Sequence, residues 1–175
     1  MHTVRMGCRV ALVLSLGALS LPALAARLEL QAGPSYMDRN PTSAVFVEGV
    51  FDARPIGHSR WSWSPDVSLG WIGGRSLARY DGGRYTVRDD AWLLAAGARI
   101  RYGEAGDWYR HLFVGFQPAF NTARTQSLSS PYEFVSSVGW QGRHVSVQLR
   151  HVSNGNLHSP NRGETMALIG VGIEL

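Results

Sequence analysis

The chain has 175 residues, and its 17 basic residues against 13 acidic ones give a net charge of only +4. Charged residues make up 17% of the chain, against roughly 25% in an ordinary soluble domain. This composition disfavours a coiled coil, a disordered tail and a protein of several membrane-spanning helices. The small positive charge gives only weak support to nucleic-acid binding, which we do not expect, and the length suggests one domain.

Residues 1–25 have the pattern of a secretory signal peptide. A short basic region at 1–9 precedes an apolar region at 10–22, and Ala23-Leu24-Ala25 supplies the small residues of a cleavage site. The apolar region is too short to span a membrane comfortably, so the pattern favours a cleaved signal over an anchor helix. Cleavage after Ala25 removes the only cysteine, Cys8, and leaves one exported domain at 26–175.

The exported domain repeats segments of about ten residues in which apolar and polar side chains alternate. In 91–102, Trp92, Leu94 and Ile100 share one face, while Arg99 and Arg101 share the other. A helix would bring both groups onto one side, so the period of two predicts a strand. The same alternation predicts eight strands, at 27–33, 43–52, 60–72, 91–102, 110–120, 132–140, 143–153 and 164–175.

Two kinds of barrel fit eight such strands: a soluble lipocalin-type barrel with its apolar face inside, and a membrane barrel with its apolar face outside. The face opposite the large apolar residues carries charges, which would need partners in a dry core. Aromatic residues cluster near strand ends, as in interfacial girdles, and several connections alternate between short and long. We therefore predict an all-β fold, an eight-stranded antiparallel transmembrane β-barrel.

The external end of the seventh predicted strand carries two polar residues on an apolar face. With an even number of strands both termini lie on the inner side, so 143–153 runs outward. His151 and Ser153 are two residues apart and share the face of Val147 and Leu149, which points to lipid. Polar residues that face lipid are costly and are often functional.

A serine beside a histidine is the minimum for nucleophilic acyl chemistry, because the imidazole takes the proton of the hydroxyl. Glu164 opens the next strand and could orient the histidine. Strict alternation points Glu164 into the lumen, so this role requires a bulge or a loop position. Backbone amides around Asn154, Gly155 and Asn156, or the Asn154 side chain, could stabilise an oxyanion.

These residues resemble the signature of the PagL-type lipid A 3-O-deacylases, eight-stranded outer-membrane esterases with a Ser-His-Glu triad. The resemblance rests on His151-x-Ser153-Asn154 followed by Pro160-Asn161-x-Gly163-Glu164. It implies the following roles: Ser153 as nucleophile, His151 as general base and acid, Glu164 as orienting acid, Asn154 in the oxyanion hole and Asn161 as its support. The loop before Glu164 is one residue shorter than the family pattern, which leaves the second oxyanion donor open between Gly155 and Asn156.

The implied activity is hydrolysis of the ester that holds the acyl chain at position 3 of lipid A, in the outer leaflet of the bacterial outer membrane. Lipopolysaccharide and outer-membrane lipids are then the partners, no metal or cofactor is required, and a homodimer is left open. The alternatives are a non-enzymatic structural or adhesive outer-membrane barrel and a periplasmic lipocalin-like binder.

The longest predicted connection, 73–90, is rich in arginine. Its arginines could contact lipid A phosphates through bidentate hydrogen bonds, but acidic residues are interleaved with them, which favours a solvated, self-paired loop. The arginines are Arg75, Arg79, Arg84 and Arg88, and the acidic residues are Asp81, Asp89 and Asp90.

Overall fold

The computed structural model describes residues 27–175, so the predicted signal peptide lies outside the described residues. The described chain forms eight long strands, one two-residue strand and two short 3-10 helices, and none of its helices is long and apolar enough to cross a membrane. The strands are β1 (Arg27–Met37), β2 (Asn40–Val50), β3 (Arg54–Pro55), β4 (Trp61–Ile72), β5 (Ala91–Tyr102), β6 (Leu112–Asn121), β7 (Tyr132–Gln141), β8 (Val145–Ser153) and β9 (Glu164–Glu174). The 3-10 helices are η1 (Ala78–Tyr80) and η2 (Trp108–His111).

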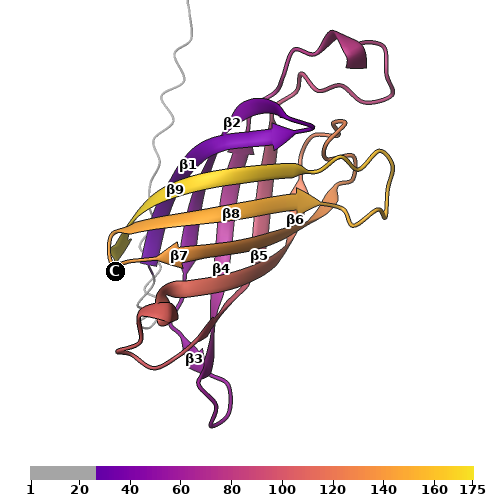
Figure 1. Cartoon of the computed structure of the whole chain (residues 1–175). Coiled ribbons are helices and arrows are strands. Elements are labelled where there is room, and N and C mark those ends of the chain that lie inside the picture. The colour runs from indigo at the N-terminus through magenta and orange to yellow at the C-terminus, as the bar shows by residue number, and fades with distance from the viewer. Residues whose placement is uncertain (1–26) are drawn as a thin grey trace, which may run out of the picture.

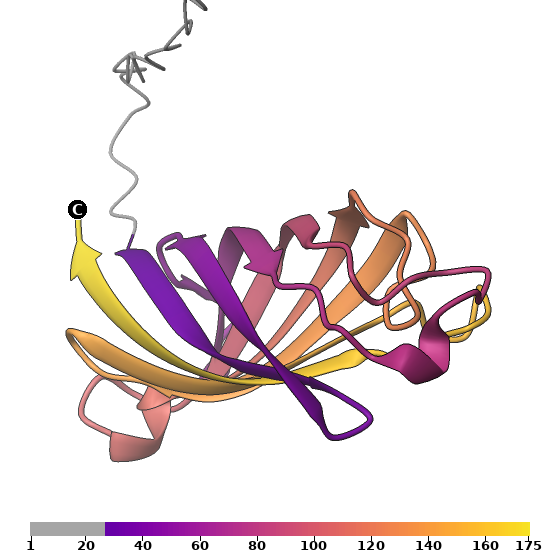
Figure 2. The ribbon, with the colours of Figure 1, turned by 90° about the horizontal axis from the view of Figure 1, so that it is seen from above.

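The long strands close into one antiparallel barrel (Figures 1 and 2). Each long strand pairs with its neighbour in the chain, and β1 pairs with β9 to close the ring. The predicted eight-stranded antiparallel barrel is therefore confirmed. The strand at 91–102 has its predicted bounds, whereas β1 continues to Met37 because the alternation persists up to a two-residue turn.

The barrel presents its apolar face outward, as a membrane barrel does and a lipocalin does not. Outward residues such as Leu94, Val114 and Ile169 are exposed, while the alternate residues of the same strands are buried. Hydrocarbon of a bilayer is the solvent that suits this outer face.

The lumen near the middle of the barrel holds a network of paired charges. Arg99 and Arg150 are fully buried, and each places a guanidinium nitrogen within 2.8 Å of Glu48 Oε2. Arg99 also lies 3.5 Å from Glu29 and 3.4 Å from Asp66. Burying charges is tolerable only with such partners, which explains why oppositely charged residues gather on the inner face.

The rest of the lumen contains an apolar layer that the sequence did not predict. Residues of this layer include Phe46, Leu93, Val152 and Met166, all almost completely buried. The Phe46 ring lies 4.4 Å from the guanidinium of Arg150 and so joins the apolar layer to the charge network. The lumen is therefore packed with side chains and not lined by polar groups alone.

The two ends of the barrel differ. The loop end is formed by the connections 38–39, 73–90, 122–131 and 154–163, and the terminal end carries both chain ends of the barrel. In Figure 1 the 73–90 connection, with η1, extends beyond the end opposite the C-terminus. The expected alternation of short and long connections holds only in part. The connection 51–60 at the terminal end is long, because it contains β3, which pairs with the start of β4 to form a hairpin.

Candidate active site

On β7, β8 and β9, four polar residues interrupt the apolar outer face toward the loop end, and we call them the outer polar patch: Ser136, His151, Ser153 and Thr165. Ser136 pairs with His151 across β7 and β8, and His151 pairs with Thr165 across β8 and β9. The other outward residues of these three strands are apolar or aromatic. His151 and Ser153 thus face outward, on the side that their alternation predicts.

His151 is held by two neighbours from β9 and the loop before it. Its Nδ1 lies 2.9 Å from Thr165 Oγ1, a hydrogen-bond distance. Gly163 packs against the ring so closely that a Cβ atom at this position would lie 2.8 Å from Cε1 of His151. Gly163 also has a φ of 68°, a conformation that suits glycine. Nε2 of His151 makes no hydrogen bond within residues 27–175 and remains free on the outer surface.

Glu164 does not reach His151, and this corrects the expected Ser-His-Glu arrangement. Its side chain is buried in the lumen, where Arg75 donates hydrogen bonds of 2.6 and 2.7 Å to its two oxygens and Ser35 donates one of 2.5 Å. The physical reason is regular pairing: Val152 faces Glu164 and His151 faces Thr165, with no bulge between them.

Thr165 is the residue that sequence reasoning missed. The strand period contained the signal for this residue. His151 points outward and Glu164 points into the lumen, so the residue of β9 that shares the face of His151 must be a neighbour of Glu164 in the chain. The structure gives that position to a hydroxyl, and Thr165 contacts the imidazole nitrogen that a carboxylate contacts in a Ser-His-acid triad.

Asn154 also differs from its expected place. Its side chain is completely buried, and its Nδ2 donates to Ser129 Oγ at 3.2 Å and to the carbonyl of His158 at 2.9 Å. Its backbone N–H donates to Asn161 Oδ1 at 3.1 Å. Both groups are therefore committed to holding the 154–163 connection and are not directed at a substrate.

Gly155 and Asn156 follow in left-handed conformations, with φ values of 62° and 65°. Their backbone N–H groups make no hydrogen bond to the part of the chain that the structure describes. Asn161 donates from Nδ2 to Asn156 Oδ1 at 3.2 Å, so it ties the two ends of this connection together. Two free backbone amides thus follow Ser153 in the chain, at Gly155 and Asn156.

An apolar surface adjoins Ser153 on the outer face. Phe134 pairs with Ser153 across β7 and β8, and its ring stacks on Phe116 with centroids 5.8 Å apart. A hydrocarbon chain that approaches Ser153 from the bilayer would meet these two rings.

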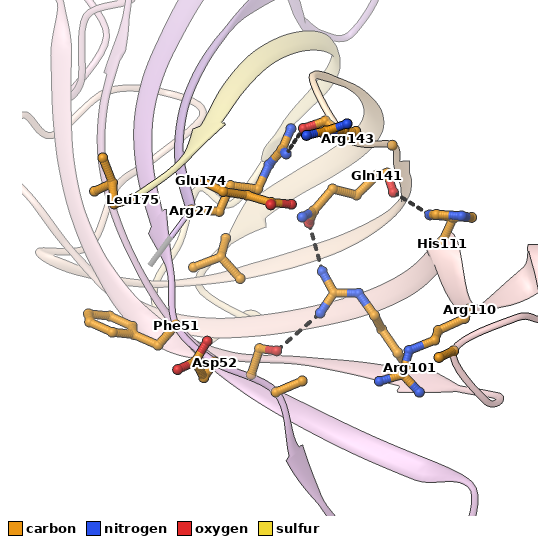
Figure 3. Close-up of a pocket in the computed structure, with 15 residues that line it drawn as sticks. Arg27, Phe51, Asp52, Arg101, Arg110, His111, Gln141, Arg143, Glu174 and Leu175 are labelled. Carbon is orange, nitrogen blue, oxygen red and sulfur yellow. Dashed lines mark hydrogen bonds between the residues drawn. The ribbon is translucent and has the colours of Figure 1, made fainter. Parts of the chain in front are cut away.

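A cavity of about 600 Å³ opens at the terminal end, on the far side of the packed lumen from the outer polar patch. Figure 3 shows Arg101 reaching across it, where its guanidinium donates to Ser64 Oγ at 3.1 Å and to Gln141 Oε1 at 2.7 Å. Arg27 and His111 also line this cavity. Its distance from Ser153 along the barrel gives it no part in chemistry at that residue.

Comparison with known proteins identifies the family. The family model described as lipid A 3-O-deacylase (PagL) matches residues 49–174. This chain belongs to the lipid A 3-O-deacylase family. The membership confirms the resemblance seen in the sequence, and it makes the chain a lipid A deacylase, an ester hydrolase, in preference to a purely structural or adhesive barrel.

The fold agrees with a solved member of that family. The crystal structure of the outer membrane enzyme PagL superposes with a TM-score of 0.62 at 17% sequence identity, covering 85% of this chain and 99% of that one. At this identity the match shows a shared barrel and does not transfer individual residues. No curated protein matches the chain.

Proposed function

We propose that this lipid A deacylase hydrolyses its ester at the outer polar patch, with Ser153 as nucleophile and His151 as general base and acid. The observation that carries the proposal is the state of His151, which is held on the lipid-facing side by Thr165 while its second ring nitrogen is free. Ser153 lies two residues further along the same strand and face. An ester at the boundary between headgroup and acyl chain lies at this level of a membrane barrel.

The proposed reaction has two halves. His151 Nε2 takes the proton of the Ser153 hydroxyl while Oγ attacks the carbonyl carbon of the acyl ester at position 3 of lipid A. His151 then gives this proton to the sugar oxygen as the ester bond breaks, which leaves an acyl-enzyme. Water, activated by the same nitrogen, releases the hydroxy fatty acid and restores Ser153.

Thr165 takes the place that a carboxylate holds in a Ser-His-acid triad. Its Oγ1 lies 2.9 Å from His151 Nδ1. In the reaction proposed here Oγ1 accepts the N–H of Nδ1, and Nε2 is then unprotonated and able to act as a base. The hydroxyl holds the ring orientation, but because it can donate as well as accept it does not fix the tautomer as a carboxylate does, and it offers no negative charge to the imidazolium that forms. Glu164, which is paired with Arg75, has no part in this step.

The oxyanion of the tetrahedral intermediate is stabilised by the free backbone amides of Gly155 and Asn156. Their left-handed conformations and lack of partners support this role, and the hydrogen bonds of Asn161 hold the connection in shape. The stacked rings of Phe116 and Phe134 provide the surface along which the acyl chain lies.

The same proposal places the barrel in the outer membrane with its loop end outside, as an outer-membrane enzyme of the same fold suggests. Residues 1–25 then serve as the signal peptide for export, and the domain at 26–175 forms the barrel. The ester would be attacked in the external leaflet.

The decisive experiment incubates purified barrel in detergent with lipid A and follows loss of one hydroxyacyl chain by mass spectrometry. Ser153→Ala and His151→Ala should each abolish the loss, with folding checked by heat-dependent migration on gels. The matched control is Ser43→Ala, an outward serine of β2 at the same end of the barrel. Full activity in either patch variant would contradict the assignment.

A further inference from the structure

Three arginines from separate connections gather around one aspartate at the loop end. Arg39 comes from the turn between β1 and β2, Arg79 from η1, and Arg162 from the connection before β9. Together with Asp38 they line one surface hollow, and we call these three residues the arginine cluster. Arg162 donates a hydrogen bond to Asp38, and Arg79 lies 3.9 Å from the same carboxylate oxygen.

The cluster carries an excess of positive charge. Three guanidinium groups face one carboxylate, which leaves two positive charges in excess. Partial burial raises the pKa of the Asp38 carboxyl, but hydrogen bonds from Arg162 and Tyr80 outweigh it and hold that pKa below its usual value. Asp38 is thus ionised at neutral pH, and Arg39 makes no ion pair within the described residues.

Two of the arginines are held in position and still exposed. The guanidinium of Arg79 lies 4.7 Å from the ring centroid of Tyr80, and that of Arg162 lies 5.1 Å from it. The Tyr80 hydroxyl in turn donates to Asp38 at 3.1 Å. The side chains of Arg79 and Arg162 nevertheless remain 54% and 41% exposed, so N–H groups are available to a ligand.

The hollow lies beside the outer polar patch. Arg162 directly precedes Gly163, which packs on the His151 ring. On the other side, Tyr36 pairs with Thr165 across β1 and β9, and Asp38 is two residues beyond it. A lipid with its ester at Ser153 would therefore place its headgroup at the rim where the arginine cluster lies.

Of the other three arginines of the 73–90 connection, Arg75 and Arg88 pair with carboxylates, while the guanidinium of Arg84 lies 5.3 Å from the ring centroid of Tyr85. Arg75 is buried against Glu164, and Arg88 makes a bidentate pair with Asp81. The expected self-pairing of this connection is therefore seen for Arg88, while Arg75 turns into the barrel and Arg79 turns to the hollow. Among these, only Arg79 joins a site with surplus charge.

We propose that the arginine cluster binds a phosphate monoester on the headgroup of the lipid whose ester is cleaved. The proposal rests on the assignment of Ser153 and His151 as the site of hydrolysis. Guanidinium groups form bidentate, charge-assisted hydrogen bonds with phosphate oxygens, and three of them from different segments can surround one phosphate. The cluster thus sets specificity for a phosphorylated glycolipid, outside the membrane-embedded chemistry.

The first test compares lipid A with the same lipid after removal of its phosphates. The double variant Arg79→Gln/Arg162→Gln should raise KM for the phosphorylated lipid by about tenfold and leave kcat unchanged. The lost charge-assisted hydrogen bonds hold the headgroup equally in the bound lipid and in the transition state. KM for the dephosphorylated lipid should not change. The matched control Arg84→Gln/Arg124→Gln removes two exposed arginines of the same end and should change neither KM. An equal rise for both lipids would overturn the proposal.

The second test reads binding without turnover. Ser153→Ala barrel in detergent micelles should retain phosphorylated lipid A about tenfold better than the dephosphorylated lipid, and the added double variant should erase this difference. Equal retention of both lipids, with inorganic phosphate alone bound, would overturn the lipid assignment. If the Ser153→Ala barrel still deacylates lipid A, the proposed function is wrong. The difference in retention between the two lipids then still shows whether the arginine cluster binds phosphate.

Discussion

Two polar clusters lie back to back across the barrel wall, and they are built on different principles. Inside, Glu164 is buried and accepts hydrogen bonds from Arg75 and Ser35, so its charge is fully compensated. Outside, His151 and Thr165 share one hydrogen bond, carry no paired charge and leave a ring nitrogen free. The inner cluster uses all its hydrogen bonds to hold the structure together, whereas the outer cluster leaves one ring nitrogen available, as the proposed reaction requires.

The difference teaches that the side of a strand decides the role of a residue. Glu164 and Thr165 are consecutive, yet one belongs to the lumen and the other to the lipid face. Placing an unpaired carboxylate against lipid costs much free energy, whereas placing a hydroxyl that is hydrogen-bonded to an imidazole there costs little. Residue type in sequence order is therefore a weaker guide to the active site than the parity of the strand position.

The largest expected effect comes from breaking the outer cluster. His151→Gln should lower kcat for lipid A deacylation by at least about 10³-fold, because the serine loses its base. The urea midpoint for unfolding in lipid vesicles should stay unchanged, since the His151 side chain is exposed. A large loss of stability with retained activity would show that His151 has a structural role and would contradict the assignment of catalysis to the outer face.

Breaking the inner network should do the opposite. Glu48→Gln leaves Arg99 and Arg150 without their shared carboxylate and should lower the free energy of unfolding by about 3 kcal/mol. The deacylation rate per folded molecule should not change. Asp52→Asn, which alters an exposed carboxylate at the terminal end, is the matched control and should leave the unfolding curve in place.

The pair of neighbours at the start of β9 sharpens the comparison further. Thr165→Val should lower kcat by about tenfold, because His151 loses the hydroxyl that holds its ring in place. Thr165→Glu should raise kcat above that of the wild type, because a carboxylate there stabilises the imidazolium. Steady-state kinetics on lipid A measure both, and a rate that ignores residue 165 would refute its positioning role.

Glu164→Gln is the control on the other face of the same strand. It should leave kcat unchanged and lower thermal stability, since Arg75 loses a buried carboxylate. A selective fall in kcat with stability intact would return Glu164 to the catalytic machinery.

A smaller effect is expected where the loop touches the ring. Gly163→Ala introduces a Cβ 2.8 Å from Cε1 of His151 and places a side chain at a φ of 68°. The imidazole must shift, so kcat should fall several-fold, and the backbone strain should cost about 1 kcal/mol of stability. Gly57→Ala, at a positive φ with open space around it, separates the strain from the contact. Equal kcat in both variants would show that the contact with His151 does not matter.

Much of the fold follows from the period of two. The alternation at 91–102 predicts both the bounds of β5 and the face of Arg99, because lipid and lumen impose opposite polarity on successive residues. The same rule places His151 and Ser153 on the outer face. The apolar layer around Leu93 and Phe46 was missed, because apolar residues on both faces erase the contrast on which the rule depends.

The strand period points Glu164 into the lumen, but the partner that holds it there was beyond sequence reasoning. The partner of Glu164 is Arg75, which is 89 residues away in the chain and lies three residues after the end of β4. Without that partner in view, Glu164 looked free to orient a histidine. The hydrogen bonds of Asn154 to Ser129 and His158 were hidden in the same way, since they join two separate connections.

The packed lumen has a consequence for permeability. Arg99, Arg150, Phe46 and Leu93 are each at most 1% exposed, so side chains occupy the axis along which a porin would conduct. We expect no single-channel current from this barrel in a planar bilayer. A cell could therefore insert many copies to deacylate lipid A without opening a route for ions, nutrients or antibiotics.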